Sequence, residues 1–191
     1  MPNSETKPSI GTVLFDLETN GLLNDDNTRI HCMVLHYLQD GRTETFNDEC
    51  PGKGMSSPIV RGVQHLQLAD TIIGHNIINF DLPIIKNIFP FFRYSGRIID
   101  TLILSRCYHP NLYDIDVNHK WKDMPTKLYG RHSLEAYGYR LGEYKGDYGK
   151  TTDWENWSQD MEDYCVQDVV VTKKLCKHFH PYLNGSNKNI R

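Results

Sequence analysis

The chain has 191 residues, of which 39% are hydrophobic, and carries 21 Lys and Arg against 24 Asp and Glu, a formal net charge of −3. This length and apolar content suffice for one well-buried core and predict a single domain. A run of about 18 apolar residues and a basic-then-apolar leader are both absent, which argues against a membrane span and a secretory signal, so we expect an intracellular protein.

The predicted elements begin after a polar tail over residues 1–11. Residues 12–18 form a short strand, and residues 29–38 form a second β-rich run. Asp40-Gly41 predicts a two-residue hairpin turn, after which residues 42–46 return antiparallel to the second strand. The first part of the chain is therefore expected to be a three-strand meander.

Helices and strands alternate in the middle of the chain. The sequence predicts a helix ending near Leu68, a strand at Thr71–Gly74, a helix at Leu82–Phe89, a strand at Arg97–Ile99 and a helix at Thr101–Tyr108. Antiparallel strands followed by alternating helices and strands indicate an α/β domain with a mixed sheet. We place this domain at residues 12–183, followed by a polar C-terminal end at residues 184–191.

The last long helix has the clearest start. Ser158 is suited to cap it, and acidic residues in its first turn favour the helix dipole. Its apolar stripe consists of Met161, Tyr164, Cys165, Asp168, Thr172, Leu175, Cys176 and Phe179. Asp168 lies on that stripe one turn after Tyr164, so the carboxylate and the tyrosine hydroxyl are expected to face the same space.

Four acidic residues in three separated motifs stand out: Asp16 and Glu18 on the first strand, Asp81 after the fourth strand, and Asp168 on the last helix. Residues two apart on a strand share a face, so the carboxylates of Asp16 and Glu18 are neighbours. All four sit in apolar, structured segments, where an unpaired carboxylate is costly unless a cation or hydrogen bonds compensate it. The pattern predicts a bound metal.

The five cysteines are dispersed without a CxxC spacing and the nine histidines show no HExxH pattern, which argues against a disulfide framework and a structural zinc site. We expect reduced core thiols. An Asp and Glu cluster without Cys or His is a hard-oxygen site for Mg²⁺ or Mn²⁺. Phosphodiester enzymes pair two such ions, one to generate hydroxide and one to stabilise the leaving oxygen.

In this scheme Asp16 bridges both metals, and Glu18 and Asp168 complete the shell of the ion on the nucleophile side. Asp81 holds the second ion, and the Tyr164 hydroxyl orients the attacking water. Each motif alone has a plainer interpretation, namely a solvated strand face, a helical coincidence or an Asx turn. Their joint occurrence, each on an element that aims it inward, favours the catalytic interpretation.

The overall charge is not that of a typical nucleic-acid binder. Two divalent cations would nevertheless bring the formal charge of −3 to +1. Residues 117–150 carry a local excess of three positive charges, with seven basic residues against Asp123, Glu135, Glu143 and Asp147. The basic residues are Lys120, Lys122, Lys127, Arg131, Arg140, Lys145 and Lys150. This stretch is suited to follow a phosphate backbone.

The motifs Asp-x-Glu, Asn-x-x-x-Phe-Asp and Tyr-x-x-x-Asp resemble those of DEDDy-type 3′-5′ exonucleases of the DnaQ-like, RNase H-like superfamily. More narrowly, residues 99–106, 132–143 and 164–173 resemble the N-terminal proofreading domain of family A DNA polymerases from T-seven-type phages. The resemblance covers nearly all of residues 12–177. It implies an RNase H-like fold, a mixed five-stranded sheet flanked by helices, and the catalytic roles assigned above.

The resemblance also implies roles in substrate binding. Thr19 and Leu22 would lie near the 3′-terminal nucleotide, with Leu22 wedged between bases, and Asn76 would contact the strand. Plain loop packing is the alternative for Leu22. Asp100 is expected to support the site, the alternative being a helix N-cap for the run starting at Thr101. Apolar platforms with a cationic track are typical of non-specific single-strand binding.

The sequence thus predicts an exonuclease dependent on two Mg²⁺ or Mn²⁺ ions that removes 5′-mononucleotides from single-stranded or frayed DNA. One alternative is an RNA or short-oligonucleotide exonuclease of RNase D type, which recognition of a 2′-OH would decide. Another is a non-catalytic nucleic-acid-binding accessory module. The resemblance further implies that the protein acts in the cytoplasm of a bacterial or phage-infected cell. It leaves three possibilities for the chain: a free-standing nuclease, an excised domain, or a subunit that works with a separate polymerase chain.

Overall fold

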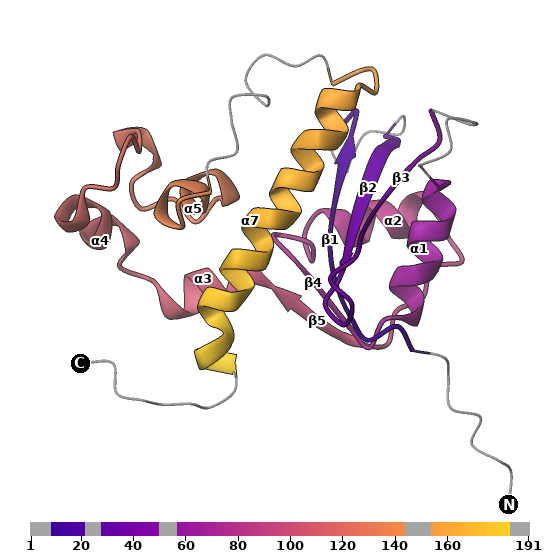
Figure 1. The fold of residues 1–191 in the computed structure, drawn as a ribbon, viewed down its shortest axis with the longest axis horizontal. Coiled ribbons are helices and arrows are strands. Elements are labelled where there is room, and N and C mark those ends of the chain that lie inside the picture. The colour runs from indigo at the N-terminus through magenta and orange to yellow at the C-terminus, as the bar shows by residue number, and fades with distance from the viewer. Residues whose placement is uncertain (1–8, 22–27, 50–56, 144–153, 184–191) are drawn as a thin grey trace, which may run out of the picture.

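The computed structural model describes residues 9–21, 28–49, 57–143 and 154–183. At its centre is a mixed five-stranded sheet with the strand order β3-β2-β1-β4-β5 (Figure 1). The strands are β1 (Thr12–Thr19), β2 (Ile30–Tyr37), β3 (Thr43–Asn47), β4 (Thr71–Gly74) and β5 (Arg97–Asp100). The first three pair antiparallel, and β4 and β5 continue the sheet parallel to β1. The predicted meander and mixed sheet are confirmed.

Helices cover both faces of this sheet (Figure 1). They are α1 (Ile59–Leu68), α2 (Asp81–Ile88), α3 (Thr101–Tyr108), α4 (Leu112–His119), α5 (Leu134–Arg140) and α7 (Gln159–Leu183), with a short 3₁₀ helix η1 at Thr126–Leu128. Among the described residues, no helix combines the length and apolar character that crossing a membrane requires.

The alternation of side chains along β1 divides the core between the two faces. Val13, Phe15 and Leu17 lie in the cluster that packs against α1 and α2. Leu14 lies in the cluster on the other face, together with Met161 and other residues of α7. Because Asp16 and Glu18 follow the same alternation as Leu14, β1 presents them to the α7 side of the sheet.

A third apolar cluster joins the second half of α7 to the layer formed by α3, α4 and α5. Leu112, Tyr137, Leu175 and Phe179 are its central buried residues. One helix therefore spans from the sheet to the outer helical layer, as Figure 1 shows. The predicted N-cap of α7 is confirmed, since the Met161 amide donates to Ser158 Oγ at 3.2 Å.

The predicted two-residue hairpin at Asp40-Gly41 is wrong. β2 ends at Tyr37 and β3 begins at Thr43, so the turn spans residues 38–42. A two-residue type I′ turn requires a positive φ at both central positions. Here only Gly41 has one, at 75°, while Asp40 does not. The longer turn is closed by the Tyr37 amide donating to the Arg42 carbonyl at 2.9 Å.

Candidate functional site

The core of the candidate site is a group of three side chains from β1 and α7. One carboxylate oxygen each from Asp16 and Glu18 and the Sγ atom of Cys165 all lie within 4.8 Å of one another. Cys165 is fully buried, and its thiol donates to Asp16 Oδ2 across 3.6 Å. The structure thus brings the two predicted carboxylates together and adds a sulfur atom to them.

Cys165 lies beside the two carboxylates as a hydrogen-bond donor. Burial raises the pKa of this thiol well above its usual value, and the neighbouring Cys32 thiol and the charges of Asp16 and Glu18 act in the same direction. The thiol therefore stays protonated and donates rather than accepts. Its place on the apolar stripe of α7, three residues before Asp168, was the sequence signal for this position.

Asp81, the first residue of α2, supplies a third carboxylate. Its side chain is only 2% exposed, and its Oδ1 atom has no hydrogen-bond partner within the described part of the chain. Burial, helped by the charges of Asp100 and Asp168, raises the pKa of Asp81 to about 7, although hydrogen bonds from its own backbone amide and from the Leu17 amide act against the rise. These interactions place Asp81 beside β1 and α7, in the same acidic group.

Asp168 lies on α7 and is 7% exposed, and its charge acts on Asp81. Tyr164 precedes it by one helical turn and is half-buried. The structure thus brings Asp16 and Glu18 together on β1 and places Asp81 near Asp168 and the Leu17 amide, and Asp81 Oδ1 is buried without a hydrogen-bond partner among the described residues. This donor set fits divalent cations, for which Asp16, Glu18, Asp81 and Asp168 are the candidate ligands.

The loop between β4 and α2 is held by Asp100. Its carboxylate accepts from the Asn76 amide at 2.9 Å and from the Ile78 amide at 3.0 Å. It also accepts from the Leu102 amide at 2.9 Å, which is the N-cap of α3. The N-cap interpretation of Asp100 is therefore confirmed, while its support of the site stays a prediction. The bonds stabilise Asn76, whose φ of 66° is unusual for a residue other than glycine.

Gly74 allows this loop to lie against β1. A Cβ atom at residue 74 would come within 2.9 Å of the Phe15 carbonyl oxygen and within 2.3 Å of the Ile77 side chain. The close approach of β4 to Phe15, the residue before Asp16, therefore requires glycine at this position.

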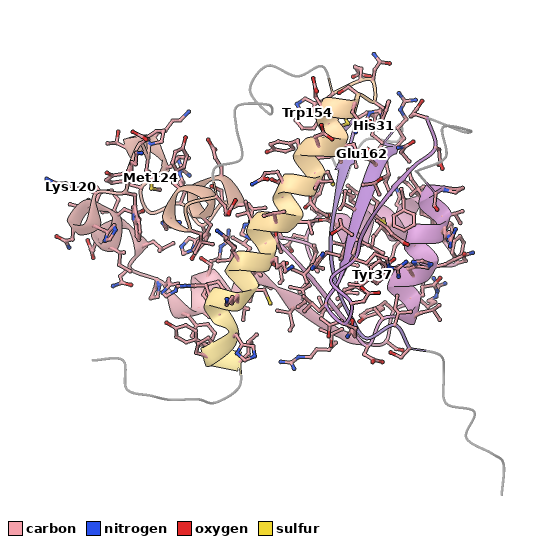
Figure 2. All side chains as sticks on the ribbon, viewed as in Figure 1. His31, Tyr37, Lys120, Met124, Trp154 and Glu162 are labelled. Carbon is pink, nitrogen blue, oxygen red and sulfur yellow. The ribbon has the colours of Figure 1, made fainter. Side chains whose placement is uncertain are left out.

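A pocket of about 390 Å³ lies beside the acidic group. It is lined by Glu18, Thr19, Asn20, Gly21, Phe80 and Trp154. Thr19 lines this pocket next to Glu18, and its predicted contact with a 3′-terminal nucleotide stays a prediction, whereas Leu22 falls outside the described residues. Trp154 was not predicted. Its carbonyl oxygen lies 3.0 Å from Nε2 of His31 on β2, and Figure 2 shows both residues near the start of α7.

Two of the predicted substrate-binding residues line a second cleft of about 450 Å³. It contains Asn76 and Arg131, and its lining also includes His75, Leu102, Arg106, Gly130, His132, Ser133 and Leu134. Burial and the charges of Arg106 and Arg140 lower the pKa of His132, so its imidazole is neutral near pH 7. The positive charge of the cleft comes from Arg106 and Arg131.

The predicted lysines do not gather at this cleft. Lys120 caps the C-terminal end of α4, and Figure 2 places it at the outer end of the helical layer, away from Trp154. Lys122 lines a different pocket, beside Gly138 and Tyr139. Lys127 lies on η1, and like Lys120 it is exposed. Of the four predicted basic residues, Arg131 alone lines the cleft that contains Asn76.

Arg140, counted above in the basic stretch, is unavailable to a phosphate backbone. It forms a buried ion pair with Asp116, in which the two side chains are 4% and 0% exposed. Lys145 and Lys150 lie outside the described residues. The sequence did not predict Arg106, because it stands on α3 outside the basic stretch of residues 117–150, and only the fold brings it to the cleft with Arg131.

The comparisons with known proteins agree with this geometry. The family model of the RNase H superfamily matches residues 13–180. The chain is 33% identical over 197 residues to the DNA-directed DNA polymerase of Enterobacteria phage T3, covering 87% of this chain and 27% of that protein. It is 32% identical over 200 residues to the same enzyme of Escherichia phage T7, covering 88% and 27%.

The chain therefore spans about a quarter of the length of these curated relatives. A solved structure, the family B DNA polymerase of the archaeon Pyrobaculum calidifontis, matches 90% of this chain and 25% of its own, with a TM-score of 0.49 and 17% identity. The predicted RNase H-like fold is confirmed by the family match and by the sheet described above. The chain belongs to the RNase H superfamily.

Proposed function

We propose that the chain is a divalent-metal-dependent 3′-5′ exonuclease of DEDDy type that removes 5′-mononucleotides from single-stranded or frayed DNA. The observation that carries this proposal is the adjacency of Asp16 and Glu18 on β1 together with the buried Asp81, whose Oδ1 has no hydrogen-bond partner among the described residues and whose carboxyl group feels the charge of Asp168 on α7. A group of carboxylates with a raised pKa is costly in a protein that binds no cation. Nucleases of the RNase H superfamily use divalent metals, and two such ions would be Mg²⁺ or Mn²⁺ here.

The bound cations would supply activation of water and neutralisation of the leaving oxygen. The side chains of the protein would hold the reactants around them. Asp16 and Glu18 share one face of β1 and would hold the cation beside the attacked phosphate. Asp81 and Asp168 would complete the ligand set. The half-buried Tyr164 hydroxyl, one turn from Asp168, would orient the water for attack on phosphorus.

The two pockets support a single strand as the substrate. Thr19, Phe80 and Trp154 line the one beside Glu18, and aromatic rings stack on bases regardless of sequence. Asn76, Arg106 and Arg131 line the other, where two guanidinium groups suit a phosphate backbone. The relatives that are DNA polymerases favour DNA over RNA as that strand. They also suggest a polymerase, in the same or a separate chain, as the functional partner.

A gel time course with 5′-labelled DNA and RNA oligonucleotides of matched sequence, in Mg²⁺, Mn²⁺ or EDTA, tests the proposal. We expect a ladder that shortens from the 3′ end of DNA with either metal and vanishes in EDTA. Asp16→Ala should reduce the rate by at least about 10³-fold. Asp114→Ala, which removes an exposed carboxylate on α4, is the matched control and should retain the wild-type rate.

Other outcomes would change the assignment in defined ways. Cleavage of RNA alone would move the protein to the RNA-processing class. If the protein binds DNA equally with and without metal and cleaves neither DNA nor RNA, it would be assigned as an accessory binding module.

A further inference from the structure

A groove of about 530 Å³ lies between α7, the strand β1 and the turn that follows β2. It shares no lining residue with the two pockets of the proposed nuclease site. In Figure 1, α7 crosses this face of the sheet. The volume falls within the roughly 300–1,000 Å³ that ligand sites occupy. The groove is therefore a candidate binding surface that the proposed hydrolysis does not use.

The floor of the groove is apolar. Leu14 is fully buried there, whereas Leu38 and Val170 are 43% and 37% exposed. Exposed apolar side chains are ordinary when they are scattered, but two that line one groove form a patch that a partner's apolar side chain can cover. Among the described residues that line the groove there is no Phe, Tyr or Trp ring on which a nucleobase could stack.

Lysines of α7 form one side of the groove, namely Lys173, Lys174 and Lys177. They follow Val170 by three, four and seven positions, so all four side chains share one face of the helix. Lys174 forms an ion pair with Glu143 at 2.5 Å. Lys173 and Lys177 form no ion pair within the described part of the chain. Because like charges four residues apart destabilise a helix, an anionic partner would relieve a repulsion between these two lysines.

The charge of Lys173 acts on the sheet beside the apolar floor. Burial lowers the pKa of His36 on β2, and the charge of Lys173 lowers it further, against a smaller opposing effect of Asp40. His36 is paired across the sheet with Leu14 of the groove floor. Cationic and apolar groups therefore adjoin here, and an occupant that matches both must combine carboxylates with an apolar side chain.

We propose that this groove docks a partner protein through a short acidic segment that carries an aliphatic or aromatic anchor. The anchor covers Leu38 and Val170, and carboxylates beside it pair with Lys173 and Lys177. A nucleic-acid strand fits less well, because the lysines suit phosphates but the floor offers no stacking surface. The inference concerns binding of a protein and does not depend on hydrolysis.

Fluorescence anisotropy with a labelled short peptide of glutamate and aspartate around two leucines tests the proposal. The double variant Lys173→Glu/Lys177→Glu should weaken binding by at least about tenfold, since two attractions become repulsions. Val170→Glu should have a similar effect, because it places a carboxylate on the apolar floor. Lys86→Glu, at an exposed lysine of α2 on the other face of the sheet, is the matched control and should change the affinity by less than about twofold.

Two altered peptides separate the contributions of anchor and charge. One carries serine in place of leucine, and the other carries amides in place of the carboxylates. Each should bind the wild type at least about tenfold more weakly than the original peptide. Circular dichroism verifies the fold of each protein variant, and all of them should cleave DNA as the wild type does, so that loss of docking and loss of the nuclease are distinguished.

Three results would overturn the proposal. One is that the wild type does not bind the acidic peptide, or that the groove variants bind it equally well. Another is that oligothymidylate binding, and not peptide binding, is lost in Lys173→Glu/Lys177→Glu, which would make the groove a nucleic-acid surface. The third is that light scattering detects self-association of the wild type that the same variant abolishes, which would make the groove an interface between two copies of the chain.

Discussion

Asp116 and Asp81 are both buried carboxylates, yet their surroundings are opposite. Asp116 is 0% exposed and accepts four hydrogen bonds. Two come from Arg140, at 2.9 and 2.7 Å, and one each comes from Trp121 Nε1 and the Gly130 amide, at 2.8 Å. Asp81 is 2% exposed and leaves one oxygen without a partner in the described part of the chain.

The pKa values follow this contrast. Burial acts to raise the pKa of Asp116, but the bonds from Arg140 and the Gly130 amide outweigh it, and the pKa is lowered. Burial raises the pKa of Asp81 to about 7, because the backbone amides of Asp81 and Leu17 lower it too little to outweigh burial and no cationic side chain is among the causes. A buried carboxylate whose oxygens all accept hydrogen bonds from the protein stabilises the fold. A buried carboxylate with an oxygen that lacks such a bond is instead a candidate for binding a ligand.

Removing the satisfied carboxylate should have the largest effect on stability. Asp116→Ala leaves the buried guanidinium of Arg140 without a counter-charge, which costs about 3–5 kcal/mol of unfolding free energy. Urea denaturation measures this loss, and Asp114→Ala on the same helix is the exposed control. Recovery in the double variant Asp116→Leu/Arg140→Met would identify the orphaned charge as the cause, and no recovery would reject it.

A substitution of Tyr164 tests whether the acidic group of Asp81 and Asp168 is catalytic. Tyr164→Phe removes the hydroxyl of a residue one helical turn before Asp168 and should lower turnover by about 10²-fold while KM changes little, since the proposed role concerns orientation of water and not strand binding. Steady-state kinetics on a single-stranded oligonucleotide separate the two constants. A wild-type turnover number would remove Tyr164 from the mechanism.

Asp81→Asn should stabilise the metal-free protein. Because the native state holds the Asp81 proton up to about pH 7 and the unfolded state releases it near 3.8, the stability of the wild type falls as pH rises between these values. At pH 8 in EDTA we expect a gain of about 1–2 kcal/mol, a part of the ~4 kcal/mol that such a shift represents. Thermal melts across pH test this. Addition of Mg²⁺ should stabilise the wild type more than the variant.

The pair formed by His109 and His178 should give the smallest effect. Their Nε2 atoms lie 2.8 Å apart, and burial lowers the pKa of both imidazoles. A depressed histidine pKa makes the unfolded state bind more protons, so stability falls as pH drops below about 6.5. Screening by solvent limits the loss to about 0.2–1 kcal/mol. Melting temperatures of wild type and His178→Gln between pH 5 and 7.5 should converge at the acidic end.

The sequence was sufficient for the elements whose pattern is strong. Period-two alternation along β1 assigned Asp16 and Glu18 to one face, and the apolar stripe of α7 placed Asp168 inward, because both patterns are local. The carboxylate group is therefore predictable. Helix α4 was not predicted, since only Leu112 and Asp116 are buried in it and it has little amphipathic pattern to detect.

Contacts between residues that are far apart in the chain could not be predicted from the sequence pattern. Arg140 was counted as a surface charge because its partner, Asp116, lies 24 residues away on another helix. Arg106 on α3 and Arg131 before α5 line one cleft, and Trp154 lines the same pocket as Glu18 although the two residues are far apart in the chain. In each case tertiary packing, and no local propensity, decides where the side chain lies.

The continuity of α7 makes its length as important as its residues. The helix carries Asp168 into the acidic group and, eleven positions later, Phe179 into the outer helical layer. Each residue of an α-helix turns the next by about 100° and advances it by about 1.5 Å. An insertion or deletion of a single residue between these two positions would keep every side chain, yet it would rotate one contact face away from its partners. Variation in this helix is thus expected to proceed by substitution, whereas the connecting loops tolerate changes in length.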